Sequence, residues 1–359
     1  SLTKICASLP PLMKLTETNK ISLDDKLSKY LPSLDTSDKK DLIIGDILTH
    51  QAGLEPWIPF YLSTLESLDP EIQLFSSRLT DDYPFKLAKR YYMTKHLKYI
   101  DGVFEGSFSL DFPMQVASSL YLNRAYRDTI YNRIINSERS KREGYKYSDL
   151  GFYLFYRMIE KIYKKPFYNL LAEKYYQPLG STTLGFLPLN RFEKERIVPT
   201  ENDILFRRQL IHGHVHDPGA AMLGGISGHA GLFSNANDLA KLMQMYLQKG
   251  LYGGEKYFNE ETLELFTSRP YCETGNRRGY GFDKPKLENQ KYGPSCDDIS
   301  DKSYGHTGFT GTMAWVDPEM NVVYIFLSNR IHPDANNTKL IKMDVRTNIQ
   351  QAIYEAIIK

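Results

Sequence analysis

The sequence has little of several features that would indicate a function directly. No run of about 18 or more apolar residues is present, so it predicts no membrane-spanning helix. Lys and Arg number 45 against 43 Asp and Glu, giving a formal net charge of +2. That balance excludes the concentrated basic excess typical of a general nucleic-acid binder. The three cysteines, Cys6, Cys272 and Cys296, cannot all pair within one chain and lack metal-ligand spacing, so no disulfide framework is indicated.

Internal repeats, low-complexity linkers and a signal peptide are also missing, although a signal segment ahead of the first residue could have been removed. What the chain does have is length and tyrosine. Its 359 residues, 42% of them hydrophobic, can bury one large core or two modest ones. Many of the 26 tyrosines fall between residues 59 and 153. A large apolar ring with a polar tip suits half-buried helix faces or the wall of a cleft.

Apolar spacing predicts helices over much of the first two thirds of the chain. The first runs to about Thr18, with a kink at Pro10 and Pro11 because each proline removes a backbone donor. From about residue 55 to 143, apolar residues recur at three- and four-residue spacing, which favours predominantly helical structure. An amphipathic helix follows from about Leu150 to Lys164, and another ends near Pro178.

The last third changes character. A glycine-rich stretch leads into a helix that Ser234 or Asn235 could cap. Two β runs flank the turn "DPEMN" and predict an antiparallel hairpin, and "DVRTNIQQAIYEAIIK" predicts a closing helix. We therefore expect an α+β fold, an α/β sandwich whose antiparallel sheet is flanked by helices, with an additional all-α subdomain.

The expected domain organisation is one catalytic domain over residues 1–359. Helical subdomain and cleft loops are assigned to about 55–145 and 150–240, and the sheet hairpin with the C-terminal helix to 275–359.

The chain opens on "SLTK", which places a serine and a lysine three positions apart at the head of an apolar helical run. Residues three apart share one helix face, so the Lys4 amine can reach the Ser1 hydroxyl. Ser1 could be a helix cap, a role that serine favours. It could instead be a nucleophile with Lys4 as the base that removes its proton. The S-x-x-K pattern is short, so other motifs must decide between them.

Two further motifs follow in order, "YSD" at Tyr147 and "HTG" at His306. With "SLDDKLSKYLPSL", "ILTHQAGL" and "GGISGHAGLFSNANDLAKLMQMYL", they resemble the serine β-lactamase and penicillin-binding protein family. The similarity is strongest to its class C-like esterases and D-aminopeptidases, and to the domain often fused to a family 3 glycoside hydrolase in Bacteroidetes-type bacteria. It covers most of the chain and implies a β-lactamase/transpeptidase-like fold with acyl-serine chemistry.

The resemblance also implies roles for individual residues. Ser1 would be the nucleophile, and Lys4 and Tyr147 would carry its proton. The backbone N–H of Phe309, with that of Ser1, would form the oxyanion hole. Gly308 would let its strand approach the substrate closely.

Two positions depart from the family pattern. Asp149 stands where the family usually has Asn, and its negative charge should favour protonated Lys4 and weaken it as a base. His306, followed by Thr307 of the third motif, stands where the family has Lys, so a permanent positive charge that would steer a substrate carboxylate is lost. This favours small esters, amides or D-amino-acid peptides, including peptidoglycan fragments, over β-lactams.

The family places a helix and two strands before the serine, and these are missing here, so the numbering is expected to start inside a longer chain. The resemblance further implies export to the periplasm or cell envelope and a small-molecule or peptide substrate. A glycoside hydrolase domain would be a covalent partner. We expect no cofactor, no nucleic-acid partner and no membrane span.

Other interpretations stay open. An N-terminal-nucleophile hydrolase uses a terminal serine and its own amine, but leaves the other two motifs unexplained. A catalytically impaired domain could bind peptidoglycan fragments or assist the fused glycosidase, which Asp149 favours. A true class C-type β-lactamase is the third alternative.

The histidines of the sequence allow more than one interpretation. If "HGHVHD" is a strand, His212, His214 and His216 share one face and could bind zinc. The alternative is a polar loop bordering the cleft, and our prediction assigns no metal. His50 and His229 are expected to be hydrogen-bonded structural histidines.

Overall fold

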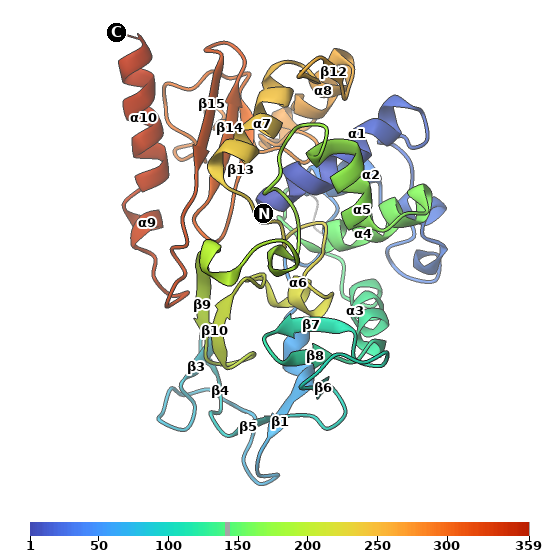
Figure 1. Cartoon of the computed structure of the whole chain (residues 1–359), viewed down its shortest axis with the longest axis vertical. Helices are drawn as coiled ribbons and strands as arrows, with labels where there is room; N and C mark the ends of the chain where they lie inside the picture. Colours follow the sequence, from blue (N-terminus) through green and yellow to red (C-terminus); the bar gives the residue numbers. More distant parts are fainter. Residues whose placement is uncertain (141–143, 359) are drawn as a thin grey trace.

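A three-stranded antiparallel sheet forms one side of the computed structural model, which describes residues 1–140 and 144–358 (Figure 1). Its order is β13 (Tyr304–Thr307), β14 (Met313–Asp317) and β15 (Val322–Phe326). The predicted hairpin is confirmed as β14 and β15, and β13, which carries the third motif, pairs with the other edge of β14.

Helices cover both faces of this sheet. Since alternate residues of β14 point to opposite faces, neighbouring residues pack against different helices. Val316 packs in the same core as α7 (Ala236–Leu247), whereas Trp315 packs with Tyr354 of α10 (Val345–Ile358). Every residue of β14 is buried. The predicted α/β sandwich and the closing helix are therefore confirmed within the described residues.

A group of helices lies on the far side of α7 from α10, and Figure 1 places the N-terminus near the centre of the molecule, between these helices and the sheet. They are α1 (Leu9–Glu17), α2 (Ile44–Leu48), α4 (Leu150–Tyr163) and α5 (Phe167–Leu171). A π-helical turn, η1 (Lys4–Ser8), precedes α1 and contacts α4. This contact brings the first and second motifs together.

The two prolines lie where η1 passes into α1. In η1 the N–H of Leu9 bonds to the carbonyl of Lys4, five residues back. The next two donors in that register would be Pro10 and Pro11, which have no N–H. The predicted interruption of the helix therefore takes the form of a change from π to α geometry, and two carbonyls of η1 lose their helical partners.

Two buried tyrosines supply the missing donors. The hydroxyl of Tyr246 donates to the carbonyl of Ile5 over 2.7 Å, and that of Tyr176 donates to the carbonyl of Cys6 over 2.9 Å. All four residues are buried, so these bonds satisfy acceptors that water does not reach. Side chains from α7 and from η5 (Ala172–Tyr176) thus hold the turn that carries Lys4.

The prediction of mainly helical structure between residues 55 and 143 is wrong for most of that stretch. Three small antiparallel sheets, β1–β5, β2–β4–β3 and β6–β8–β7, gather at the lower end of the molecule (Figure 1). Their bounds are β1 (Leu65–Ser67), β2 (Phe75–Ser76), β3 (Phe85–Ala88), β4 (Tyr91–Met93), β5 (Leu97–Tyr99), β6 (Phe104–Glu105), β7 (Met114–Ala117) and β8 (Leu120–Leu122).

Only the turn η4 (Phe60–Thr64) and α3 (Ala125–Ile135) are helical among the described residues of this stretch. The physical reason is that its strands are two to four residues long and joined by tight turns. Apolar residues then recur every three or four positions, as in a helix, although aromatic residues favour strands. Residues 141–143, part of the same prediction, lie outside the described residues, as does residue 359 at the end of the predicted closing helix.

The remaining elements are short. They are η2 (Leu27–Lys29), η3 (Pro32–Leu34), η6 (Pro188–Asn190), η7 (Lys194–Arg196), β9 (Pro199–Asp203), β10 (Gln209–His212), α6 (Pro218–Met222), β11 (Leu251–Tyr252), β12 (Glu255–Lys256), α8 (Glu260–Thr267), η8 (Cys272–Thr274) and α9 (Lys339–Lys342). The predicted cap of α7 is Asn235, whose side chain accepts from the N–H of Asp238.

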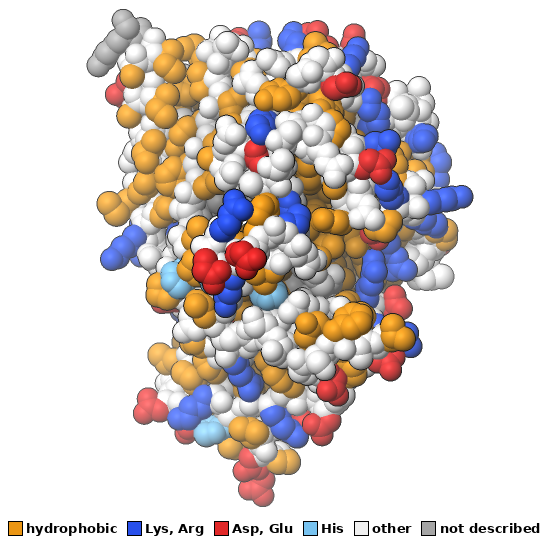
Figure 2. Space-filling view, in the orientation of Figure 1, with side chains coloured by type: hydrophobic (Ala, Val, Ile, Leu, Met, Phe, Trp, Pro, Cys, Tyr) orange, Lys and Arg blue, Asp and Glu red, His pale blue; other side chains and the backbone are white. Residues whose placement is uncertain are grey.

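The surface is mixed in character. On the face that Figure 2 shows, acidic and basic side chains are interspersed, and hydrophobic side chains gather over α10, where Ile349, Ile353 and Ile357 are exposed. Among the described residues, no helix combines the length and apolar character needed to cross a bilayer.

Candidate active site

Three polar side chains from two distant parts of the chain meet at the start of η1. The Oγ atom of Ser1 lies 2.9 Å from Nζ of Lys4 and 3.0 Å from the hydroxyl of Tyr147. Lys4 donates to the Tyr147 hydroxyl over 2.8 Å, which closes a triangle. A serine hydroxyl in contact with two groups that can exchange protons is the arrangement that nucleophilic catalysis requires.

Asp149 adds a fourth member, with its Oδ1 atom 2.5 Å from Nζ of Lys4. The Lys4 side chain is fully buried, and it donates to Ser1, Tyr147 and Asp149, so the three N–H bonds of an ammonium group are all used. Burial lowers the pKa of Lys4, but Asp149 and Tyr147 outweigh burial and raise that pKa above its usual 10.5. Lys4 is therefore an ammonium group in this structure.

Asp149 is held ionised by the same pair. Burial raises the pKa of its carboxyl, but the charge of Lys4, followed by a smaller electrostatic effect of His229, outweighs burial and lowers that pKa below 3.8. The residue also stands at the N-cap of α4, although its side chain makes no capping bond. Its carboxylate is thus directed at Lys4 and not at the helix.

The second motif lies just before α4 and is held in place by His50 and Glu55. The ring of His50 lies 4.3 Å from that of Tyr147, and its Nδ1 accepts the N–H of Ser148 over 3.2 Å. The hydroxyl of Ser148 donates to the carbonyl of Glu55 over 2.5 Å. Burial, followed by the charges of Arg278 and Lys4, holds the pKa of His50 well below 6.5, so it is neutral. The structure places His50 as a support of Tyr147.

The third motif runs along β13 and reaches the same place. His306 is buried, and its ring centroid lies 6.3 Å from that of Tyr147. Its Nδ1 lies 2.7 Å from the carbonyl oxygen of Thr307, and its Nε2 lies 3.1 Å from Nη1 of Arg278. Burial and then the charge of Arg278 hold the pKa of His306 well below 6.5, so this position carries no positive charge at neutral pH.

The predicted oxyanion residues follow β13 directly. A Cβ atom on Gly308 would lie 3.8 Å from the backbone nitrogen of Ser1, so the two stretches of backbone are close. The N–H of Phe309 makes no hydrogen bond to any described residue. The Phe309 ring stacks on His216 at 5.2 Å and lies 4.7 Å from the guanidinium of Arg330, which also binds its carbonyl. The N–H of Phe309, one residue after Gly308, is therefore free to take the expected oxyanion role.

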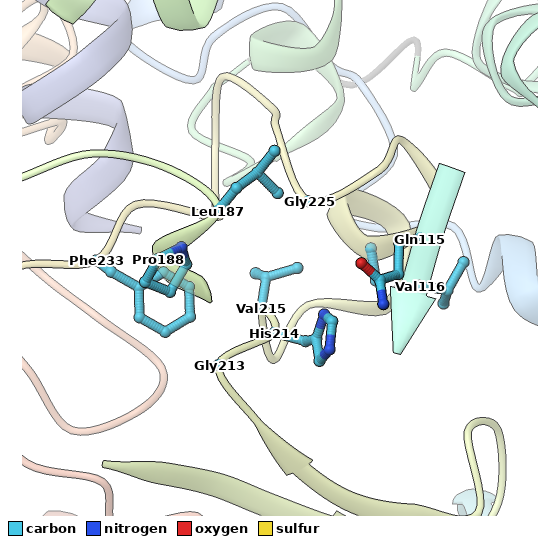
Figure 3. A pocket seen from close by; sticks show the side chains of 10 residues that line it. Gln115, Val116, Leu187, Pro188, Gly213, His214, Val215, Gly225 and Phe233 are labelled. Atoms are coloured by element: carbon cyan, nitrogen blue, oxygen red, sulfur yellow. The ribbon is translucent and has the colours of Figure 1, made fainter. Parts of the chain in front are cut away.

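The strand premise behind the zinc interpretation of "HGHVHD" is wrong, because β10 ends at His212. His212 bonds to the carbonyl of Ile197, and His216 to the carboxylate of Glu201. His214 points into a small pocket beside Gln115 and Val116 of β7 (Figure 3). Among the described residues, no group of three or more His, Cys, Asp or Glu side chains could hold a metal ion.

His229 belongs to a separate buried network next to the site. Its Nε2 lies 2.9 Å from Asp217 and its Nδ1 lies 2.9 Å from the hydroxyl of Ser227. Burial raises the pKa of Asp217, but the opposing effect of His229 is larger, and the net direction is strongly downward. Both ring nitrogens are bonded, as expected for a structural histidine.

Sequence reasoning missed Arg278. It is buried, pairs with Asp283 over 3.1 Å, and lies with its guanidinium carbon 5.3 Å from the centre of the Tyr147 ring. The only local signal is the pair of arginines at 277 and 278, with Asp283 shortly after. Nothing in that pattern connects it to His306, which lies 28 positions further along the chain.

Comparison with known proteins gives a consistent picture. A family model described as "Beta-lactamase" matches residues 1–345. A relative from Escherichia coli K12, named "Putative D-alanyl-D-alanine carboxypeptidase", is 29% identical over 92% of this chain and 68% of its own. One from Bacillus subtilis 168, named "N-acetylmuramyl-L-alanine amidase", is also 29% identical, over 92% of this chain and 67% of its own.

A solved penicillin-binding protein homologue from Caulobacter crescentus shares the fold. It superposes with a TM-score of 0.54 at 16% identity, over 92% of this chain and 76% of that one.

Proposed function

The chain belongs to the beta-lactamase family, and we propose that it is a serine hydrolase that forms an acyl-enzyme on Ser1. Its substrates would be small amides, esters or D-amino-acid peptides derived from peptidoglycan, and its activity on β-lactams would be weak. The observation that carries the proposal is the Ser1–Lys4–Tyr147 triangle, whose three distances lie between 2.8 and 3.0 Å.

In the proposed acylation step, Ser1 Oγ attacks the substrate carbonyl carbon as its proton passes to Lys4. The oxyanion that forms accepts hydrogen bonds from the backbone at Phe309 and Ser1. When the carbonyl–nitrogen or carbonyl–oxygen bond breaks, the hydroxyl of Tyr147 protonates the leaving atom. The proton on Lys4 then passes to the Tyr147 phenolate, and the neutral Lys4 takes a proton from the water that attacks the acyl carbon. That proton passes to Ser1 Oγ as its bond to the acyl carbon breaks, which releases the acid and restores the site.

This route requires a neutral Lys4, whereas the structure favours its ammonium form. The fraction of molecules with a neutral Lys4 grows as pH rises toward the raised pKa of this residue. We therefore propose that activity is low at neutral pH and increases in alkaline solution.

The substrate class rests on two observations. The named relatives act, by their names, on a D-alanyl-D-alanine bond and on the N-acetylmuramyl-L-alanine amide. In this chain His306 is neutral, so the third motif itself offers no charge to a β-lactam carboxylate. Such a substrate would place the protein in the periplasm or cell envelope, which is part of the proposal.

Covalent labelling tests the nucleophile. A fluorophosphonate probe should label the protein on Ser1, and Ser1→Ala should remove the label. The exposed Ser107→Ala is the matched control and should label like the wild type. Equal labelling of Ser1→Ala and wild type would overturn the assignment.

Parallel kinetics test the substrate class. kcat/KM is compared on a nitrophenyl ester, a D-alanyl-D-alanine peptide, an N-acetylmuramyl-L-alanine peptide and a chromogenic cephalosporin. We expect the cephalosporin to be the poorest of the four. A cephalosporin kcat/KM far above the others would show that His306 has been misinterpreted and that the chain is a β-lactamase in activity.

A second candidate function is a catalytically impaired domain that binds peptidoglycan fragments. The Lys4–Asp149 ion pair favours it, because it stabilises the form of Lys4 that cannot accept a proton. The two candidates separate experimentally, because the impaired domain would bind muramyl peptides without labelling Ser1 at any pH.

A further inference from the structure

The hydrogen bonds of His306 determine which of its nitrogens carries the proton. A carbonyl oxygen only accepts, so the contact between Nδ1 and Thr307 requires a proton on Nδ1. A guanidinium only donates, so the contact between Nε2 and Arg278 requires a bare Nε2. Both bonds form together only in the neutral Nδ1–H tautomer. If both ring nitrogens carried protons, the N–H at Nε2 would face the N–H donor of Arg278, and the positive ring would repel the positive guanidinium.

Arg278 is fixed in place from the other side. Its Nη2 lies 3.1 Å from Oδ2 of Asp283, and its backbone N–H donates to the side chain of Asn276 over 3.0 Å. The amide of Asn276 in turn donates to the carbonyl of Thr49, next to His50. The guanidinium therefore has little freedom to leave His306, and its charge is permanent because arginine does not lose its proton in proteins.

The same charge faces the Tyr147 ring. The guanidinium carbon lies 5.3 Å from the centre of that ring and 5.9 Å from the centre of the Tyr145 ring. Nζ of Lys4 lies 5.0 Å from the Tyr147 ring centre, so two cations lie beside the tyrosine. Nζ of Lys4 also lies 2.8 Å from the phenol oxygen, and Arg278 faces the ring, so in this buried site both charges attract negative charge that develops on the phenol group.

We propose that Arg278 is a positioning residue of this site, which places a permanent positive charge beside the Tyr147 ring and holds His306 as its neutral Nδ1–H tautomer. The proposal rests on the proposed function. When Tyr147 gives its proton to the leaving group, its O–H bond breaks and a bond to the leaving atom forms. Arg278 stabilises the phenolate that remains until the proton taken from Ser1 by Lys4 returns to it.

The chain offers a matched control in Arg277. It binds the same carboxylate, with its Nε 2.8 Å and its Nη2 3.1 Å from the two oxygens of Asp283. The structure gives Arg277 no contact with His306 or Tyr147 among the described residues. Arg278→Gln and Arg277→Gln therefore each remove one charge from the same carboxylate, and only the first removes it from the site.

The first readout is the rate of fluorophosphonate labelling and its pH profile. Arg278→Gln should label about 10- to 100-fold more slowly than wild type, and Arg277→Gln should match wild type. Arg278→Lys, which keeps the charge, should recover most of the rate. The charged and titratable groups around Arg278 and His306 are Asp283, Arg277, Tyr145, Tyr147, Lys4 and His50. Because Arg277→Gln also removes a cationic partner of Asp283, its pH profile identifies the changes in labelling rate that arise from Asp283 alone.

The second readout is independent of activity. Nitrogen-15 NMR of the His306 ring should show the Nδ1–H tautomer in wild type between pH 5 and 9. Arg278→Met should produce a ring that titrates or mixes tautomers.

Equal labelling rates for the two Gln variants, or an Nε2–H tautomer in wild type, would overturn the proposal. Absence of Ser1 labelling in wild type would instead refute the proposed function, while the NMR result would still test the role of Arg278 in holding His306. If Arg278→Gln fails to fold, Arg278→Lys decides: a rate below one tenth of wild type would reject the charge argument.

Discussion

The carboxylate of Asp149 lies 2.5 Å from the ammonium nitrogen of Lys4, inside the site that also holds Ser1 and Tyr147. The family resemblance marks Asp149 as a departure from the usual Asn. The distance gives that departure a chemical consequence. The carboxylate forms an ion pair with the ammonium group of Lys4, stabilises it, and so opposes formation of the neutral amine.

Asp149→Asn should move the rise of activity with pH to lower pH. Loss of the carboxylate removes the largest favourable charge on protonated Lys4, so its pKa falls and the neutral amine forms in less alkaline solution. Each unit of that fall corresponds to ~1.4 kcal/mol. The measurement is kcat/KM against pH on one ester substrate.

The control for this experiment is Asp111→Asn, a surface carboxylate paired with Arg124. Its profile should coincide with that of wild type. Coincidence of the Asp149→Asn profile with wild type as well would show that Asp149 does not tune Lys4 and is only structural.

Tyr246→Phe and Tyr176→Phe should each lower the free energy of unfolding by about 1–3 kcal/mol, because each leaves a buried carbonyl of η1 without a donor. Chemical denaturation measures the change, and the exposed Tyr292→Phe is the matched control. If both buried variants are as stable as the control, the carbonyls of Ile5 and Cys6 do not depend on these hydroxyls.

The thiols should differ sharply in reactivity. Burial raises the pKa of Cys6 to about 12 and that of Cys296 to about 11, whereas Cys272 is exposed. A thiolate is the reactive form, so an aromatic disulfide reagent at pH 8 should modify Cys272 rapidly and the other two only on unfolding. Cys272→Ser should remove the rapid phase, and a rapid phase that persists in this variant would contradict the burial of Cys6 and Cys296.

Much of the site could be anticipated from sequence. The contact between Ser1 and Lys4 follows from helical spacing, since residues three apart share a face. Spacing could not show that Tyr147 and His306 join them, because the contacts of Tyr147 with Lys4 and Ser1 span 143 and 146 positions and His306 lies further along the chain. Only the resemblance to a family supplied that information. The catalytic roles of these residues stay predictions.

Other parts could not be predicted because their signals are ambiguous or not local. Short strands such as β3 and β4 mimic the apolar spacing of a helix. The π geometry of η1 depends on hydroxyls from Tyr176 and Tyr246, far along the chain. Arg278 contacts His306 only because the loop that follows Arg278 brings β13 back beside it.

Gly151→Ala should destabilise the protein by about 1–3 kcal/mol through overpacking. Gly151 lies in the first turn of α4, two residues after Asp149, and a Cβ atom there would collide with the side chain of Ile47 in α2. For α4 to relieve the clash it must move away from α2, and the segment that carries Tyr147 would move with it. The labelling rate at Ser1 should therefore fall together with stability. Gly106→Ala is the control, since nothing lies within 4 Å of a Cβ at that position. A Gly151→Ala protein that unfolds and labels like the control would show that the packing of α4 on α2 does not position the site.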